Sequence, residues 1–260
     1  MLPTKVYDSI LAKLSAHALL AILLDPEFGT PEEIGQYAAN AVEKGADIIL
    51  VGGSSHVEPQ GFFASLKEVQ TQLAGRAPVI IYTEDFNMVS DHADAILYGS
   101  VLNSQDPHYL VKMPVFSAPL IRKIGLEALN TGFLIFEPGG TVGHVLNCQL
   151  LPRSNPKISL AYSIGAELLG SRLVYLEAGS RAAEPLPAEL VRLHRKNLSI
   201  PIIVGGGVKS PAKAAALVEA GASIVVVGTA VEEGADVEAF ATSVHTTAYI
   251  KPPVVTQLTN

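Results

Sequence analysis

The sequence predicts one α/β domain over residues 1–260, a (β/α)8 TIM barrel. Eight short aliphatic runs recur along the chain, each followed by glycine, proline or polar residues. These runs are almost continuously hydrophobic, which is typical of parallel strands that are covered on both faces. Helix-like segments lie between the runs, and a length of 260 residues suits one barrel of eight strands and eight helices.

The eight apolar runs are the predicted strands of the barrel, and a helix is expected after each. Thr30 is a predicted N-cap for a helix over Pro31–Lys44, and Ser210 is the equivalent cap for Pro211–Ala220. The predicted strands are Leu19–Leu24, Ile48–Val51, Val79–Tyr82, Ala95–Tyr98, Phe133–Phe136, Leu173–Leu176, Ile202–Val204 and Ile224–Val227.

Composition excludes several classes of function. The net charge is −7, which argues against nucleic acid as a partner because phosphate-backbone binding needs a clustered basic surface. The longest apolar runs fall well short of the ~20 residues of a membrane span, and the N-terminus lacks a signal pattern, so we expect a cytoplasmic protein. Cys148 is the only cysteine, which excludes an intrachain disulfide, and the histidines show no metal-ligand spacing.

In this fold the residues that follow the strands gather at one mouth of the barrel, where the chemistry takes place. Here those residues are mainly acidic residues and glycines. They are Asp25–Glu27, Gly52–Ser55, Thr83–Asp85, Glu137–Gly140, Glu177–Ser180, Gly205–Gly207 and Gly228–Thr229.

Two glycine turns near the end of the chain indicate a phosphate site. Gly205–Gly207 follows the seventh predicted strand and Gly228–Thr229 follows the eighth, where barrels of this type commonly hold phosphate. Glycines let backbone N–H groups approach an anion closely. The alternative is that these glycines only make tight turns. Their pairing at both loops favours the phosphate site.

Carboxylates follow the first and sixth strands. Glu177 can accept a proton or hydroxyl hydrogen bonds, with Gly179 and Ser180 as further donors, although a structural cap is the alternative role. Asp25 can hold Mg²⁺, a hard ion that prefers oxygen ligands, and Ser54 can complete the ligand set. Taken alone, Asp25 could equally cap a helix.

Five motifs, in this order along residues 15–235, resemble the geranylgeranylglyceryl phosphate synthase family. The sequence YLEAGS at Tyr175–Ser180 is specific, and its combination with the other four is strong. Those four are Leu24-Asp25-Pro26, Val51–Ser54, Gly205–Gly207 and Gly228-Thr229. The stretches Leu102–Ser104 and Glu167–Gly170 resemble the family as well.

The resemblance implies a Mg²⁺-dependent transfer of a polyprenyl group from its diphosphate to the 3-hydroxyl of sn-glycerol 1-phosphate, which forms an ether. It also implies a homo-oligomer and transient contact with a membrane surface. Asp25 and Ser54 would be the metal residues, and Glu177 the catalytic base. The residues holding glycerol 1-phosphate would be Tyr175, Leu176, Glu177, Ala178, Gly179, Ser180, Arg181, Gly205, Gly206, Gly228 and Thr229. The prenyl tail would need an apolar groove, for which Phe116, Phe133, Leu134 and Tyr98 are candidates, although each could belong to the core instead.

The chain departs from the family pattern at Arg181, where the motif usually runs on with glycine. Leu23–Pro26 and YLEAGS favour the geranylgeranyl-type branch over the heptaprenyl branch, which resembles KLDP and YIEYSG. Two other readings remain: a different phosphate-binding barrel, such as an isomerase or a thiamine phosphate synthase-like transferase, and a non-catalytic phosphate-binding barrel. The joint presence of Asp25, Ser54 and Glu177 speaks against the last.

Overall fold

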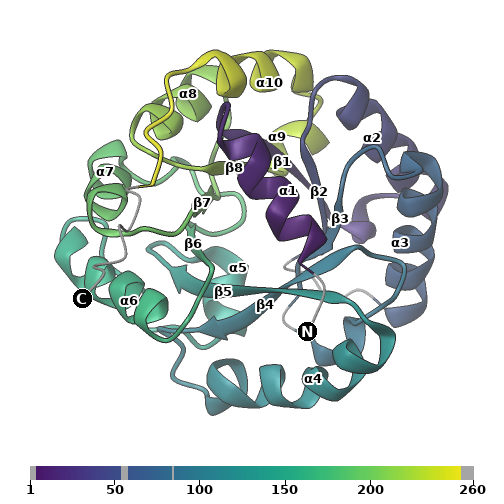
Figure 1. The fold of residues 1–260 in the computed structure, drawn as a ribbon, viewed down its shortest axis with the longest axis horizontal. Helices are drawn as coiled ribbons and strands as arrows, with labels where there is room; N and C mark the ends of the chain where they lie inside the picture. Colours follow the sequence, from purple (N-terminus) through teal and green to yellow (C-terminus); the bar gives the residue numbers. More distant parts are fainter. Residues whose placement is uncertain (1–3, 54–57, 84, 253–260) are drawn as a thin grey trace, which may run out of the picture.

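Eight parallel strands close into one barrel in the computed structural model, which describes residues 4–53, 58–83 and 85–252 (Figure 1). Each strand pairs with the next in chain order, and β8 pairs with β1, so the sheet has no free edge. The predicted fold class is confirmed. The strands are β1 (Leu19–Leu24), β2 (Ile48–Val51), β3 (Val79–Ile81), β4 (Ala95–Val101), β5 (Glu127–Ile135), β6 (Leu173–Glu177), β7 (Ile202–Gly205) and β8 (Ile224–Val227).

Helices form a ring around the barrel, and one further helix lies across its N-terminal end. That helix is α1 (Lys5–Leu14), seen in front of the strands in Figure 1. The ring consists of α2 (Pro31–Glu43), α3 (Pro59–Leu73), α4 (Met113–Ile124), α6 (Pro156–Leu168), α7 (Ala188–Asn197), α8 (Pro211–Glu219) and α10 (Val237–Thr246). Shorter elements are the 3-10 turns η1 (Pro26–Phe28) and η2 (Phe86–Met88), the π-helical turn η3 (His108–Lys112), and the helices α5 (Gly140–Val145) and α9 (Thr229–Glu232).

The predicted repeat of strand, loop and helix fails once, between β3 and β4. The described residues of this connection, 82–83 and 85–94, form only the turn η2. Asp94 makes such a short return possible. Its carboxylate accepts hydrogen bonds from the N–H of Val79 at 2.8 Å and from the side chain of Gln70 at 3.1 Å, which ties the loop to β3 and α3.

The predicted helix starts are confirmed. Thr30 accepts a hydrogen bond from the N–H of Glu33, and the Glu33 carboxylate accepts one from the N–H of Thr30 at 2.8 Å, which makes a capping box. Ser210 caps α8 by accepting from the N–H of Lys213. Both caps stand directly after turns that follow strands, so they fix where the chain leaves the barrel mouth.

The fifth strand was predicted too short, because polar residues interrupt its apolar run. It begins at Glu127, not at Phe133, and its first seven residues pair with β4. Glu127 is buried because its two carboxylate oxygens accept hydrogen bonds from the N–H groups of Val6 and Tyr7, both at 2.8 Å. Hydrogen bonds from α1 therefore allow the charged Glu127 to occupy a buried position on β5.

Strand side chains alternate between two apolar layers. One layer fills the inside of the barrel and includes Leu19, Leu50 and Ile203. The other packs beneath the helices and includes Leu20, Ile49 and Val204. Because both faces of each strand are covered, the strands read as continuous hydrophobic runs. None of the helices among the described residues is long and apolar enough to span a bilayer.

Candidate functional site

A cavity of about 620 Å³ lies at the end of the barrel where the strands terminate. It is lined by residues that follow β1, β2, β6, β7 and β8, as the fold predicts for a site of this kind. Of the predicted site residues, the cavity lining contains Asp25, Tyr175, Glu177, Ser180, Arg181, Gly206, Gly228 and Thr229.

The structure does not bring every predicted residue into the cavity. The side chains of Leu176 and Ala178 belong to the outer apolar layer beneath the helices, because alternate strand residues point to opposite faces. Any substrate contact at these two positions would come from the backbone, and their predicted substrate-binding role stays a prediction. Gly179 and Gly205 do not line the cavity, but both contact Glu177. The N–H of Gly179 donates to its carboxylate, and the missing side chain of Gly205 leaves room for it. Ser54 lies outside the described residues, so its predicted metal role stays a prediction.

Glu177 ends β6 with its carboxylate inside the barrel. The side chain is buried, and its Oε1 accepts a hydrogen bond from the N–H of Gly179 at 2.6 Å. Burial raises the pKa of Glu177, because it disfavours the charged form, and the hydrogen bonds from Gly179 and Tyr175 offset only part of this rise. The carboxylate is therefore a stronger base than an exposed glutamate. Tyr175, two residues earlier, is buried on the same inner face, and burial beside Glu177 raises its pKa as well.

The glycine turn after β7 leaves space around Glu177. A Cβ atom at Gly206 would lie 2.6 Å from Oε1 of Glu177, and the backbone there has φ of +82°, a conformation that favours glycine. A Cβ at Gly205 would collide with the Tyr175 hydroxyl and would lie 3.0 Å from Oε2 of Glu177. Gly205 and Gly206 are therefore required for the packing of the carboxylate as well as for any approach to an anion.

Asp25 lies across the cavity, at the end of β1. Its Oδ1 caps η1 by accepting a hydrogen bond from the N–H of Glu27 at 3.0 Å, so the capping role is real. Its Oδ2 lies against Gly53, where any side chain would overlap the carboxylate. Burial raises the pKa of Asp25, and the neighbouring Glu27 adds to the rise. One oxygen of Asp25 is therefore committed to the turn, and the other faces the cavity wall.

Glu232 on α9 is a second acidic lining residue that the sequence did not single out. Its pKa is raised by burial and by the charge of Asp25, whereas Arg181 lowers it. A carboxylate whose pKa is raised by a second carboxylate is better accommodated when a cation lies near both, so this side of the cavity fits Mg²⁺. No three carboxylate or imidazole atoms converge here among the residues the structure describes. This suits an ion that takes most of its ligands from water and substrate phosphates.

Two cations line the same cavity. Arg181 occupies the position where the family usually has glycine, and it adopts a left-handed backbone with φ of +58°. Its guanidinium lies 5.8 Å from the ring centre of Phe28. Lys209 follows the glycine turn after β7, and its role as a cavity residue was missed. A basic residue directly after a predicted phosphate-binding turn was the signal that could have found it.

A narrow apolar crevice adjoins the cavity, and the two share Tyr82 and Val142. The ring of Tyr82 stacks on Tyr175 at 5.4 Å and on Phe133 at 6.1 Å, measured between ring centres, which makes an aromatic wall between the polar and apolar spaces. The rest of the crevice is formed by Thr83, Leu97, Gly99, Val101, Tyr109, Met113, Ile135 and Leu146.

The four predicted groove residues divide between crevice, core and surface. Phe133 lines the crevice. Leu134 is part of the outer core, and Tyr98 packs against that core with its hydroxyl donating to the carbonyl of Pro114 at 2.9 Å. Phe116 lies on the outer surface of α4 and is exposed. The predicted groove roles of Leu134, Tyr98 and Phe116 are therefore wrong, because none of these three side chains lines the crevice.

Comparison with known proteins gives close matches over most of the chain. The model of the PcrB family matches residues 15–247. The geranylgeranylglyceryl phosphate synthase of Thermococcus kodakarensis is 39% identical over 234 residues, which cover 90% of this chain and 92% of that protein. The synthase of the same name from Korarchaeum cryptofilum is 44% identical over 220 residues, which cover 84% and 89%.

Solved structures agree with these sequence matches. The (S)-3-O-geranylgeranylglyceryl phosphate synthase of Thermoplasma acidophilum, solved with its substrate sn-glycerol-1-phosphate, superposes with a TM-score of 0.88 at 33% identity and covers 92% of this chain and 98% of that one. The thiamine phosphate pyrophosphorylase of Pyrococcus furiosus reaches a TM-score of 0.59 at 15% identity, covering 89% and 97%, and shares the fold alone.

Proposed function

Because the chain belongs to the PcrB family, we propose that it is a prenyltransferase that makes geranylgeranylglyceryl phosphate. It transfers a polyprenyl group from its diphosphate to the 3-hydroxyl of sn-glycerol 1-phosphate and forms an ether. The observation that carries this proposal is the cavity at the barrel mouth, which joins a buried carboxylate to glycine turns in a chain 33% identical to a synthase solved with that alcohol phosphate.

The acceptor would lie between Glu177 and the two glycine turns. Gly206 and Gly228 have no side chain and Ser180 has a small one, so a phosphate can approach the backbone N–H groups of these three residues closely. Lys209 at the rim adds a positive charge. With its phosphate fixed there, glycerol 1-phosphate presents its hydroxyl at high effective concentration, and the raised pKa of Glu177 suits it to take the hydroxyl proton.

Mg²⁺ is the metal we propose for the donor side of the cavity. Asp25 would hold it, with Ser54 as the second predicted ligand, and Glu232 lies close enough for its pKa to respond to the charge of Asp25. When bound, Mg²⁺ supplies charge neutralisation to the departing diphosphate. Arg181, across from these carboxylates, would bind the same diphosphate through charge-assisted hydrogen bonds.

The apolar crevice beside the cavity is the proposed start of the prenyl-binding groove. It begins at the aromatic wall of Tyr82, Tyr175 and Phe133 and continues to η3 and α4 through Tyr109 and Met113. Burial of apolar surface stabilises a bound hydrocarbon by roughly 25 cal/mol per Å². The geranylgeranyl chain is the proposed donor length, on the motifs at Leu23–Pro26 and Tyr175–Ser180.

A homo-oligomer is also proposed, with α6 as its contact surface. This helix carries only two charged residues, Lys157 and Glu167, and its C-terminal end exposes Leu168 by 82% and Leu169 by 79%. A helix that is apolar on several faces is normally covered by another element. Action in the cytoplasm remains a prediction.

The test of the proposed function is an ether-forming assay. Purified protein is incubated with Mg²⁺, glycerol 1-phosphate and radiolabelled prenyl diphosphates of several lengths, and the lipid extract is analysed for an ether product. We expect product from the C20 donor above the others, and a loss of product when a chelator removes Mg²⁺.

The enantiomer sn-glycerol 3-phosphate is the matched control, because it has the same charge and atoms in the opposite arrangement. We expect it to react at least about tenfold more slowly, the equivalent of one lost hydrogen bond. A protein that binds glycerol 1-phosphate yet forms no ether from any donor would be a binding barrel instead, and the proposal would be wrong.

A further inference from the structure

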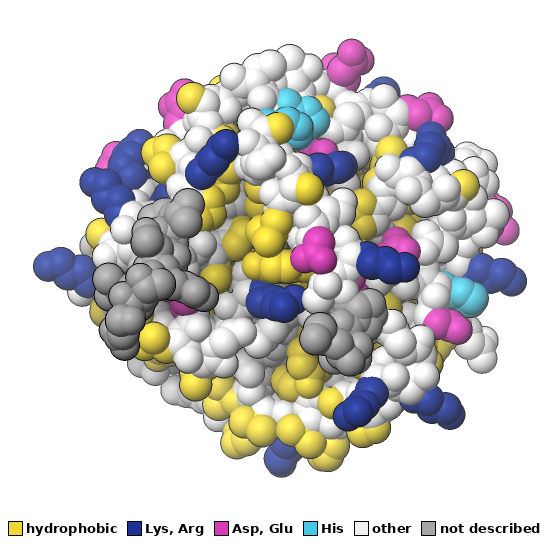
Figure 2. Space-filling model, viewed as in Figure 1, with side chains coloured by type: hydrophobic (Ala, Val, Ile, Leu, Met, Phe, Trp, Pro, Cys, Tyr) yellow, Lys and Arg dark blue, Asp and Glu magenta, His cyan; other side chains and the backbone are white. Residues whose placement is uncertain are grey.

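The outer surface of η3 and α4 is the largest run of exposed apolar side chains along a described helix. Val111 is 59% exposed, Val115 56% and Leu120 40%. Val111 and Val115 are four residues apart, and so are the exposed Phe116 and Leu120, so each pair lies on neighbouring turns of the helix. Figure 2 shows hydrophobic side chains gathered along its lower edge, where α4 lies in Figure 1. We call the surface formed by Val111, Lys112, Val115, Phe116, Leu120, Arg122 and Lys123 the α4 face.

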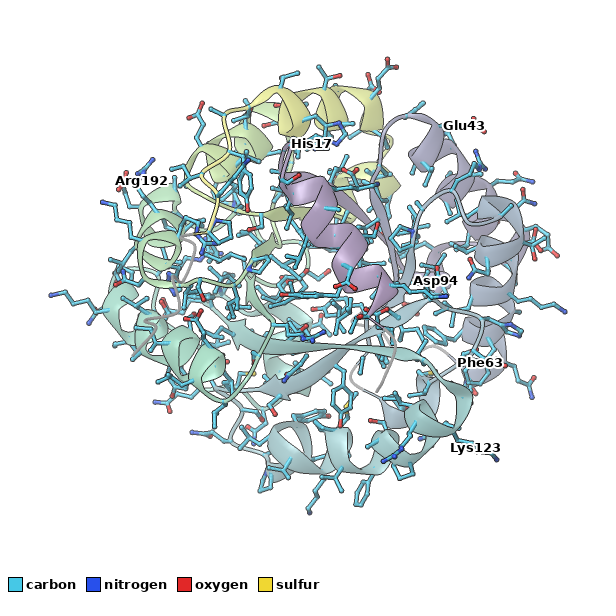
Figure 3. All side chains as sticks on the ribbon, viewed as in Figure 1. His17, Glu43, Phe63, Asp94, Lys123 and Arg192 are labelled. Carbon is cyan, nitrogen blue, oxygen red and sulfur yellow. The ribbon has the colours of Figure 1, made fainter. Side chains whose placement is uncertain are left out.

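The α4 face is basic in a protein that is acidic as a whole. The stretch from His108 to Ile124 contains no aspartate or glutamate, whereas the whole chain has a net charge of −7. Its three cations, Lys112, Arg122 and Lys123, are exposed next to the apolar residues, and Figure 3 labels Lys123 at the end of α4. Apolar residues flanked by cations are the composition of helices that lie on anionic lipid surfaces.

The α4 face and the apolar crevice lie on opposite sides of the same segment. Tyr109 and Met113 line the crevice, and they alternate along the chain with the exposed residues Val111 and Val115. The α4 face is therefore the outer side of the helix whose inner side closes the crevice.

We propose that the α4 face docks the protein on an anionic lipid surface, which places the helix that closes the apolar crevice next to the bilayer. The inference rests on the proposed function for the identity of the lipid tail, but the docking itself depends only on the charge and exposure of the α4 face. Each basic side chain near an anionic leaflet strengthens binding by about fivefold, and the exposed aliphatic side chains add burial in the headgroup region.

A second copy of the chain is the less suitable occupant. In a twofold interface, a patch contacts the same patch of the other copy. The three cations Lys112, Arg122 and Lys123 of one copy would therefore lie near the three of the other. Like charges brought together in this way are unfavourable. The surface of α6 has no such obstacle, because its two charges are of opposite sign. An anionic bilayer, in contrast, complements all three cations of the α4 face.

The experiment is co-sedimentation of the full-length protein with sucrose-loaded vesicles. One set contains phosphatidylglycerol mixed with phosphatidylcholine, and the other contains phosphatidylcholine alone. We expect binding to the anionic set, weakened by added salt. The triple variant Lys112→Glu/Arg122→Glu/Lys123→Glu should bind at least about tenfold more weakly. The variant Val111→Ser/Val115→Ser/Leu120→Ser should lose a similar factor even at low salt.

The matched control is Lys44→Glu/Lys67→Glu/Lys196→Glu, which makes the same change of net charge on exposed lysines of other helices. This control should bind anionic vesicles as tightly as the unaltered protein, because its substitutions lie outside the α4 face. If it loses as much vesicle binding as the α4-face charge variant, the proposal is overturned. Circular dichroism and thermal melting establish that each variant is folded.

Ether formation from a short, water-soluble prenyl diphosphate without vesicles separates the two proposals. Normal product from the α4-face variants, together with their loss of vesicle binding, supports docking. An active protein that ignores anionic vesicles refutes docking and leaves the enzymatic proposal standing. Sedimentation velocity gives the remaining outcome: if the α4-face variants dissociate an oligomer, the face joins copies of the chain and the docking proposal is wrong.

Discussion

Glu177 is a buried carboxylate whose surroundings favour its neutral form. Its folded-state pKa is raised above 4.5, so the ionised side chain costs stability as the pH rises through that raised value. The same shift brings its basicity closer to the working pH of an enzyme, which is what general-base catalysis requires. Function and stability therefore make opposite demands at this residue.

The variant Glu177→Gln tests both demands at once. We expect kcat to fall by about 10²- to 10⁴-fold, because the proton acceptor is lost, with KM for glycerol 1-phosphate nearly unchanged. We also expect the melting temperature to rise at neutral pH and to change little below pH 4.5, since the removed cost exists only where Glu177 is ionised. Near-normal turnover would show that Glu177 is not the base.

Gly206 and Gly234 form a matched pair for the glycine turn. Both have positive φ, +82° and +88°, but a Cβ at Gly206 meets Glu177 whereas a Cβ at Gly234 meets nothing within 4 Å. Gly234→Ala should lose roughly 1 kcal/mol of stability from backbone strain, and Gly206→Ala should lose more, because its Cβ would also lie 2.7 Å from the carbonyl oxygen of Gly179. Only Gly206→Ala should also lose activity, by at least about tenfold, because the added methyl displaces the carboxylate. Equal kinetic effects in steady-state assays would refute this reading of the turn.

Arg181 combines a left-handed backbone with a charged side chain in the cavity. We expect Arg181→Gly to be at least as stable as the original protein, because glycine relieves the φ of +58°. Its KM for the prenyl diphosphate should rise about tenfold or more through loss of charge-assisted hydrogen bonds. Arg181→Lys is the control that keeps the charge and the strain, and it should fall between the two. An unchanged KM in the glycine variant would remove Arg181 from the donor site.

At the scale of elements, α1 closes the end of the barrel opposite the cavity. Val6, Ile10 and Leu14 of α1 join the inner apolar layer, and Ile10 lines a small space at the centre of the barrel together with residues from all eight strands. The N-terminal turn of α1 is held by Glu127 of β5. Helix and barrel therefore stabilise each other without contacting the site.

The variant Ile10→Ala tests the role of α1. It should lower the free energy of unfolding by about 2–5 kcal/mol, the usual cost of a large-to-alanine change in a packed core. Leu11→Ala on the exposed side of the same helix is the comparison and should cost much less. Since Ile10 lies at the far end of the barrel, kcat should stay within about twofold, and chemical denaturation with a parallel kinetic assay would measure both. A large loss of kcat at full folding would contradict this separation.

At the scale of the whole molecule, Asp47 joins the two ends of the chain. Its carboxylate pairs with Lys13 of α1 at 3.1 Å and His245 of α10 at 2.8 Å, and it accepts from the N–H of Leu20 at 3.1 Å. His17 stacks near His245, with ring centres 4.4 Å apart. Burial would raise the pKa of Asp47, but these partners outweigh it and lower the pKa below 3.8. His17 and His245 therefore lie together although the histidines showed no spacing pattern in the sequence. Asp47 and His245 are 198 positions apart in the chain.

The lowered pKa of Asp47 predicts a pH dependence of stability. A carboxylate with a depressed folded-state pKa contributes stability above its unfolded value, and this is lost as the pH falls through the folded value. Asp47→Asn should therefore melt at a lower temperature than the original protein at neutral pH, and the difference should shrink as the pH drops below 3.8. A difference that stays constant over this range would show that the ion pairs contribute nothing to folding.

The sequence alone determined the barrel and most of the site. Continuous aliphatic runs at β1, β2 and β8 gave the strands with their observed ends, because strands covered on both faces need no polar residues. Since the fold brings all strand ends to one mouth, Asp25, Glu177 and the glycine turns could be grouped before any coordinates were known.

The tertiary structure alone decided which of these residues face the cavity and what each one contacts. The side chain of Leu176 faces away from the cavity because side chains alternate along a strand, whereas the side chains of Lys209 and Glu232 line it. The polar start of β5 and the pairing of Asp47 with His245 depend on partners far away in the chain. Local propensity acts over a few residues, whereas burial and pairing of a charge are properties of the closed barrel, so no pattern within a short window of sequence contains them.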